Sequence, residues 1–122
     1  MPEEGAEEGE VFACNWDSLR HLTQKHDFTL IIKTPECPSC EYVEAIIEKL
    51  DGDGEINELI AEVTIDENDS CLDVARRLDV RAAPTLIKFR SGREVDRFVP
   101  SLSPEKDAED LKRFLKAENA EK

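Results

Sequence analysis

Two cysteines three positions apart, Cys37 and Cys40, stand in the segment TPECPSCEYVEAIIEKL, which runs from Thr34 to Leu50. A Cys-x-x-Cys pair can hold a metal ion, form a structural bridge, or alternate between a dithiol and a disulfide. The residues that follow the pair are apolar at helical spacing, so we expect both cysteines at the start of a helix. The surroundings of this helix start decide between the three kinds of chemistry.

A thiol at position 37 would face the free backbone N–H groups and the positive end of the helix dipole. Both features favour the thiolate, and in Cys-x-x-Cys motifs the thiol pKa commonly falls from about 8.5 to roughly 3.5–7.5. Three nearby glutamates, Glu36, Glu41 and Glu44, should oppose part of this shift. The spacing thus supplies an attacking thiol, Cys37, and one helical turn further on a resolving thiol, Cys40.

A metal site would need two more ligands at compatible spacing. The remaining candidates are Cys14, Cys71, His21 and His26. None of them forms a second paired element, so we expect no zinc, no iron–sulfur cluster and no other cofactor. Both histidines are expected at the surface.

Charge and composition exclude several classes of partner. The 122 residues suffice for one domain, and their net charge is −13. A nucleic-acid backbone requires clustered Lys and Arg, and an anionic membrane surface would not attract this chain. Residues 1–10, MPEEGAEEGE, hold five acidic residues and no apolar stretch of a signal peptide, so we expect an acidic tail and a cytoplasmic protein.

The two isolated cysteines are expected to be buried structural thiols. With no secretory signal, a structural disulfide framework is not expected. A bridge between Cys14 and Cys71 is not expected either, because the two residues precede different helices.

The pattern of apolar residues predicts alternating strands and helices. A brief strand from residue 11 leads into a helix capped by Asn15, and a proline and a glycine-containing turn, RSGR, bound the later strands. Strands are predicted at 27–33, 59–66, 81–89 and 94–99, and further helices at 39–50, 69–80 and 103–118. Strands that alternate with helices imply an α/β fold with a central mixed sheet covered by helices on both faces.

The predicted helices each show an apolar face. In the helix after the cysteine pair this face comprises Val43, Ile46, Ile47 and Leu50, at the spacing of a helix packed on a sheet. In the helix over 69–80 we assign it to Leu72, Ala75 and Leu78. The last helix is expected to begin with Ser103 as N-cap and Pro104 as its first residue.

Four motifs together resemble the thioredoxin-like superfamily. They are CPSC after a buried strand, VTID 23 residues later, APT at the start of a strand, and RSG in the following turn. The resemblance covers roughly Val11 to Lys116, which we take as the domain, 11–116, with tails at 1–10 and 117–122. It implies a thioredoxin-like fold in which Pro84 is a cis-proline facing the cysteine pair.

The resemblance also implies a function, the reduction of protein disulfides by dithiol exchange. Cys37 would attack the target, Cys40 would resolve the mixed disulfide, and an upstream disulfide reductase would restore the dithiol of a monomeric protein. By the same resemblance the backbone of Ala83 pairs with the bound substrate peptide. The residues expected to contact substrate are Glu36, Pro38, Ser39, Ala83, Pro84 and Thr85. Cys71 lies in DSCLDVA, similar to a segment that carries a regulatory cysteine in animal thioredoxins.

The chain departs from thioredoxins at the residues around the motif. Glu36 replaces a tryptophan, and Pro-Ser replaces Gly-Pro between the cysteines. Thioredoxins also place a buried carboxylate six residues before the first cysteine, where this chain has Ile31. Glu62 aligns with the family's buried lysine on the next strand, and Lys33 precedes the motif. We hypothesise that Glu62 supplies the missing carboxylate; the alternative is a solvated residue at a strand edge.

These departures leave two other functions open. One is a thioredoxin-like binding module with a vestigial or regulatory motif, which the unusual Glu36 and Ile31 would permit. The other is a glutathione-linked, glutaredoxin-like enzyme, because a proline directly after the first cysteine, here Pro38, resembles the motif of glutaredoxins. The acidic surface and the lack of a Gly-Gly segment argue against glutathione as the substrate.

Overall fold

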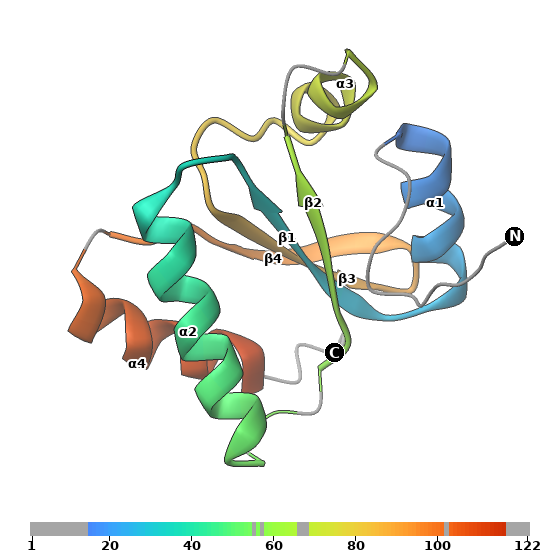
Figure 1. Cartoon of the computed structure of the whole chain (residues 1–122). Helices are drawn as coiled ribbons and strands as arrows, with labels where there is room; N and C mark the ends of the chain where they lie inside the picture. Colours follow the sequence, from blue (N-terminus) through green and yellow to red (C-terminus); the bar gives the residue numbers. More distant parts are fainter. Residues whose placement is uncertain (1–14, 55, 57, 66–68, 102, 117–122) are drawn as a thin grey trace, which may run out of the picture.

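A computed structural model describes residues 15–116, apart from residues 55, 57, 66–68 and 102 (Figure 1). The strand expected from residue 11 and the expected tails at 1–10 and 117–122 lie outside the described residues.

The described chain forms one four-stranded mixed sheet and four helices. The elements in chain order are α1 (Trp16–Lys25), β1 (Phe28–Lys33), α2 (Pro38–Gly52), β2 (Ile60–Thr64), α3 (Asp69–Arg77), β3 (Thr85–Arg90), β4 (Arg93–Phe98) and α4 (Pro104–Lys116). The strand order is β2-β1-β3-β4, with β1 and β2 parallel and the other two pairs antiparallel. The predicted α/β class with a mixed central sheet is confirmed.

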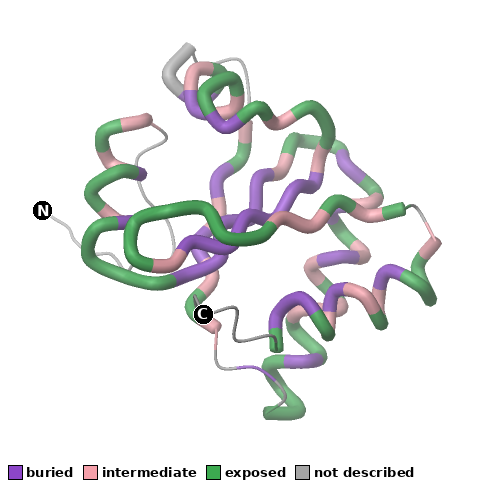
Figure 2. Tube along the Cα trace, turned by 180° about the vertical axis from the view of Figure 1, so that it is seen from behind, coloured by how far each residue is buried: buried purple, intermediate pink, exposed green. Residues whose placement is uncertain are grey.

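The helices cover the sheet in two layers. Helices α1 and α3 pack on one face, and α2 and α4 pack on the other (Figure 1). Buried residues are concentrated along the central strands, while the faces of the helices that point away from the sheet are exposed (Figure 2). The site is built where α2 begins, so the layer that holds α2 matters most for function.

Strand β1 contributes to both layers of the core. Leu30 and Ile32 belong to the cluster under α1 and α3, and Ile31 belongs to the cluster under α2 and α4. Successive side chains of a strand point to opposite faces, and a strand buried on both faces reads as a continuous apolar run. This is why FTLIIK was recognisable as a central strand from its sequence.

Several bounds differ from the prediction, since α3 ends at Arg77 rather than at residue 80 and β3 begins at Thr85 rather than at residue 81. Helix α2 begins at Pro38 rather than Ser39, since a proline fits the first helical turn, where its missing N–H costs no hydrogen bond. In α3 the assigned inward face is wrong at Leu72, which is 39% exposed. The buried residues are Cys71 and Val74 in α3, each one position earlier than assigned, and Leu78 directly after the helix.

The turn between β3 and β4 is a two-residue hairpin turn at Ser91 and Gly92. Their φ angles are 55° and 82°, so both residues adopt the left-handed conformation that matches the right-handed twist of paired strands. The expected positive φ at Gly92 is confirmed. The Asp27 carboxylate accepts a hydrogen bond from the Ser91 N–H at 2.9 Å, which ties the turn to the start of β1.

A buried carboxylate connects α2 to α4. Asp107 is 1% exposed and accepts hydrogen bonds from the Tyr42 hydroxyl and from the N–H and hydroxyl of Ser101, the last two at 2.8 and 2.9 Å. A buried carboxylate is stable only when such donors satisfy it. The network therefore fixes the first turns of α2, which carry the cysteines, against α4 and the segment that precedes it.

We expect the phenol of Tyr42 to titrate well above its ordinary pKa. Partial burial and the hydrogen bond to Asp107 raise the pKa of Tyr42 from 10.0 to about 12. Because the pKa is higher in the folded state, this contribution to stability is complete below pH 10.0 and is lost as the pH rises to about 12. Ultraviolet titration measures it directly, since the chain has one tyrosine.

A folded-state midpoint near 10 would contradict the hydrogen bond to Asp107. The variant Tyr42→Phe should lower the free energy of unfolding at neutral pH by about 1 kcal/mol and remove its alkaline decline, as measured by urea denaturation. Asp110→Asn, which alters a half-buried carboxylate on α4, the helix of Asp107, is the matched control and should leave the tyrosine titration unchanged.

Candidate functional site

Cys37 and Cys40 form a disulfide at the N-terminus of α2. Their Cα atoms are 5.1 Å apart. Cys37 is the N-cap residue, with φ −120° and ψ 97°, and its sulfur accepts a hydrogen bond from the Cys40 N–H at 3.1 Å. A helix N-terminus leaves its first N–H groups without partners inside the helix. The first cysteine thus occupies the position at which a thiolate is best stabilised by the helix.

The two sulfur-bearing residues differ in their access to solvent. Cys37 is 9% exposed and Cys40 is 3% exposed, and Cys40 lies within the first helical turn. A second protein can reach Cys37 more readily than Cys40. This asymmetry matches the assignment of Cys37 as attacking thiol and Cys40 as resolving thiol.

The chain turns sharply between β1 and α2 at Glu36. This residue has φ 55°, a left-handed conformation that costs a non-glycine residue roughly 1–2 kcal/mol. Pro35 and Glu36 are both exposed, and Pro38 on the other side of Cys37 is exposed as well. The segment around Cys37 therefore stands at the surface where an incoming chain would meet it.

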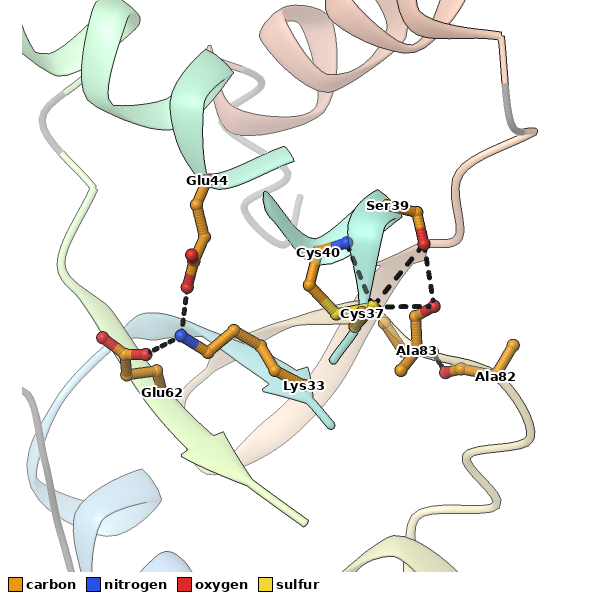
Figure 3. Close-up of a disulfide and its surroundings, with 9 residues drawn as sticks. Lys33, Cys37, Ser39, Cys40, Glu44, Glu62, Ala82 and Ala83 are labelled. Carbon is orange, nitrogen blue, oxygen red and sulfur yellow. Dashed lines mark hydrogen bonds and ion pairs between the residues drawn. A yellow bond between two sulfur atoms is a disulfide. The ribbon is translucent and has the colours of Figure 1, made fainter. Parts of the chain in front are cut away.

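The loop before β3 faces the cysteine pair (Figure 3). The peptide bond between Ala83 and Pro84 is cis. The Ala83 carbonyl oxygen lies 3.8 Å from the Cys37 sulfur and accepts a hydrogen bond from the Ser39 hydroxyl at 3.4 Å. The Thr85 hydroxyl donates to the Ala82 carbonyl at 2.7 Å. The structure thus brings together residues that are more than 40 positions apart in the sequence.

Lys33 at the end of β1 bridges two carboxylates, Glu44 on α2 and Glu62 on β2 (Figure 3). Burial acts to lower the pKa of Lys33, but hydrogen bonds to and the charges of Glu44 and Glu62 outweigh this effect and raise it. Lys33 therefore remains an ammonium ion. Its side chain extends away from the cysteines toward the two carboxylates (Figure 3).

Glu62 lies opposite Ile31 in the parallel pairing of β1 and β2. Its side chain is 40% exposed and borders a groove of about 370 Å³ between these strands and α2. The structure pairs Glu62 with Lys33. The thioredoxin resemblance implies a carboxylate on β1 and a lysine on β2, whereas this chain has the lysine on β1 and the carboxylate on β2.

Of the three glutamates expected to oppose a thiolate, Glu44 is neutralised by its ion pair with Lys33. Sequence reasoning missed this pair, because it joins a strand to a helix 11 positions away and has no local pattern. It equally missed the contact of Ser39 with Ala83. For the Lys33–Glu44 pair the signal was the strand–turn–helix order, in which α2 runs back along β1. For the Ser39–Ala83 contact it was the APT motif, by which the thioredoxin resemblance implied that Pro84 faces the cysteine pair.

Other candidate residues lie away from the pair. His21 and His26 are exposed, as expected. Cys71 is buried and disulfide-bonded, so the expectation of a free thiol there is wrong. Cys14, and with it the expectation about a Cys14–Cys71 bridge, lies outside the described residues. Within the described part of the chain, no group of three or more His, Cys, Asp or Glu side chains is arranged to hold a metal ion.

None of the described helices is both long enough and apolar enough to cross a bilayer.

Curated relatives of the chain are thioredoxins. Those of Staphylococcus saprophyticus and Staphylococcus aureus are 33% and 34% identical to it over 79 residues. The matched region is 65% of this chain and 73% of each relative. No protein-family model matches the chain.

Solved structures show the same fold. The structure of Trxlp from Edwardsiella tarda superposes with a TM-score of 0.63 at 22% identity, over 81% of this chain and 91% of that one. The reduced thioredoxin pre-protein of Schistosoma mansoni superposes with a TM-score of 0.64 at 20% identity, over 86% and 95%.

A mixed sheet between two helical layers, with a Cys-x-x-Cys disulfide where a helix begins, defines a thiol–disulfide oxidoreductase of thioredoxin-like fold. The curated relatives are similar enough to this chain, and over enough of their length, to identify its family. The chain belongs to the thioredoxin family.

Proposed function

We propose that this protein reduces disulfide bonds in other proteins, with Cys37 as the attacking residue and Cys40 as the resolving residue. The observation that carries the proposal is the position of the disulfide at the N-terminus of α2, with Cys37 as the more exposed partner. A thiolate at this position gains the free N–H groups of the helix and remains accessible to a substrate.

The reaction consists of two exchanges of sulfur partners. The Cys37 thiolate attacks one sulfur of a substrate disulfide, forms a mixed disulfide and releases the other substrate sulfur as a thiolate, which takes up a proton. Cys40 then loses its proton and attacks the Cys37 sulfur. The second substrate thiol leaves, and the Cys37–Cys40 disulfide forms. Two electrons pass from the protein to the substrate.

Substrate binding would use the surface around Cys37 and the proline loop. The Ala83 backbone lies beside the Cys37 sulfur, where it could pair with an extended substrate chain as a short β-strand does. Pro84 and Thr85 are buried and hold the loop in place, the latter through its bond to Ala82. The remaining proposed contacts with substrate are Glu36, Pro38 and Ser39.

We assign the proton acceptor for Cys40 to Glu62. The thioredoxin carboxylate position is taken by Ile31, and Glu62 is its direct neighbour on β2, on the face that α2 covers. The Lys33 side chain leads away from the cysteines to Glu62, so a proton from Cys40 would reach this carboxylate through intervening water (Figure 3). Lys33 would hold the Glu62 carboxylate in place through their ion pair.

A continuing reaction needs a source of electrons. We propose that an upstream disulfide reductase returns Cys37 and Cys40 to the dithiol after each turnover, and that the protein works as a monomer in the cytoplasm, where thiols are kept reduced. No cofactor is required by the exchange itself, because the cysteines carry both electrons.

Insulin reduction by dithiothreitol tests the activity. The wild-type protein should accelerate the appearance of turbidity, and Cys37→Ser should give the rate of dithiothreitol alone. Cys40→Ser should retain the first exchange and accumulate a mixed disulfide on Cys37, detected by mass spectrometry. Indistinguishable curves for wild type and Cys37→Ser would favour a binding module, and activity that depends on glutathione would favour a glutaredoxin-like enzyme.

The role of Glu62 is tested by the rate of resolution. Reaction of the dithiol protein with Ellman's disulfide releases two coloured thiolates, and the second reports the attack of Cys40. We expect Glu62→Gln to slow this second phase about tenfold, less than the usual effect of general-base catalysis, because the carboxylate is partly exposed. Glu48→Gln, in the same groove, is the matched control. An unchanged second phase would remove Glu62 from the mechanism.

The reduction potential decides the direction of electron flow. Equilibration of Cys37 and Cys40 with known ratios of reduced to oxidised dithiothreitol should give a reduction potential of about −270 mV, which suits a reductant. A value of about −120 to −180 mV would instead indicate an oxidant or an isomerase.

A further inference from the structure

The Ser39 hydroxyl lies between two acceptors, and it has one proton to donate. Its oxygen is 3.4 Å from the Ala83 carbonyl oxygen and 3.6 Å from the Cys37 sulfur (Figure 3). The side chain is half-buried at the start of α2. A hydroxyl rotates about its C–O bond, so a small rotation could redirect the proton from one acceptor to the other.

The oxidised state favours the carbonyl. A sulfur atom in a disulfide is uncharged and is a weak acceptor, whereas a backbone carbonyl is a strong one. The hydroxyl therefore donates to Ala83 in this structure. The distance of 3.4 Å exceeds the usual range of about 2.5–3.0 Å for a hydroxyl and an oxygen, so the bond is weak and little is lost when it breaks.

The reduced state favours the sulfur. A thiolate at Cys37 carries a full negative charge, and hydrogen bonds to charged acceptors are roughly twice as strong as those between neutral groups. The Cys40 N–H already donates to this sulfur at 3.1 Å. The Ser39 hydroxyl, on the same helical turn, is placed to supply a second donor.

We propose that Ser39 is a redox-dependent hydrogen-bond donor, which bonds the Ala83 carbonyl while Cys37 and Cys40 are a disulfide and turns to the Cys37 thiolate when they are reduced. The exchange stabilises the dithiol state, so it raises the reduction potential of the pair. Ser39 acts as a positioning residue, because its own proton stays on its oxygen throughout.

The exchange also changes what Ala83 offers a substrate. In the dithiol state the Ala83 carbonyl loses its intramolecular donor and is free to accept an N–H from an incoming chain. In the disulfide state Ser39 occupies it again. This consequence rests on the proposed function, in which the dithiol form engages the substrate and the disulfide form releases it.

The redox step balances without Ser39. Reduction of the Cys37–Cys40 disulfide takes two electrons from an external dithiol, which becomes a disulfide. The dithiol also releases two protons: one protonates Cys40, and the other passes to the solvent, which leaves Cys37 as the thiolate that the proposal requires. Dithiothreitol serves as the dithiol in the experiments below.

The first experiment follows the Ala83 carbonyl by ¹³C nuclear magnetic resonance in the wild-type protein. Reduction by dithiothreitol should move its chemical shift in the direction of a lost hydrogen bond. In Ser39→Ala the difference between the two redox states should be absent. A wild-type carbonyl that keeps the same shift in both states would overturn the proposal without the need for any variant.

The second experiment measures the equilibrium of each variant with dithiothreitol. Loss of one hydrogen bond to the thiolate should shift the equilibrium of Ser39→Ala about fivefold toward the disulfide, or about 20 mV for a two-electron couple. At a pH below the pKa of Cys37, alkylation of the reduced variant by iodoacetamide should slow by a smaller factor, because the thiolate fraction falls while the intrinsic nucleophilicity of the thiolate rises. Ser39→Thr, which keeps a hydroxyl, should lie within about twofold of wild type in both measurements.

Ser18→Ala on α1 is the matched control, because it removes a serine hydroxyl from the opposite helical layer. It should leave the equilibrium, the alkylation rate and the Ala83 shift unchanged. An equilibrium within about twofold of wild type in Ser39→Ala, or an equal effect in Ser39→Thr, would refute the proposal.

These readouts need no protein substrate. They can therefore fail while insulin is still reduced, and they can succeed in a protein that reduces no insulin, so failure of the Ser39 proposal and failure of the proposed function are distinguishable.

Discussion

The N-terminus of α2 is the point at which this protein concentrates its chemistry, and its free backbone N–H groups are the interaction on which the site depends. They act on Cys37 only while the first turn of the helix is held in place. On one side the sheet provides this support through Val43 and its neighbours in the core beneath α2. On the other side the bond between Tyr42 and the buried Asp107 joins α2 to α4.

The electrostatic arrangement beside the disulfide is the second constraint. A chain with a net charge of −13 must still stabilise a thiolate. Lys33 partly solves this problem because it neutralises Glu44 on α2 and holds Glu62 on β2. Relative to the arrangement implied by the thioredoxin resemblance, the carboxylate and the ammonium group are exchanged between the two strands. Parallel pairing places Ile31 opposite Glu62, so either strand can present a carboxylate to this side of the sheet.

Much of the fold could be predicted because its signals are local. The continuous apolar run of β1 indicated a strand buried on both faces, and the spacing from Val43 to Leu50 indicated the buried face of α2. The prediction failed at Leu72, where two apolar faces of α3 were nearly equivalent by spacing. The face with Cys71 and Val74 is the one that packs against the sheet. The helical spacing of apolar residues alone does not determine which of the two faces is buried.

The printed order of amino acids is enough to identify a Cys-x-x-Cys pair at a helix start, the strand–helix alternation around it and the proline that follows at position 84, because each is a pattern within one segment. The partners of these groups follow from the folded chain. Ser39 meets Ala83, and Lys33 meets Glu44 and Glu62, only because the sheet order β2-β1-β3-β4 brings distant segments together. Hydrogen bonds and ion pairs act over a few ångströms in space, and separation along the chain does not measure that distance.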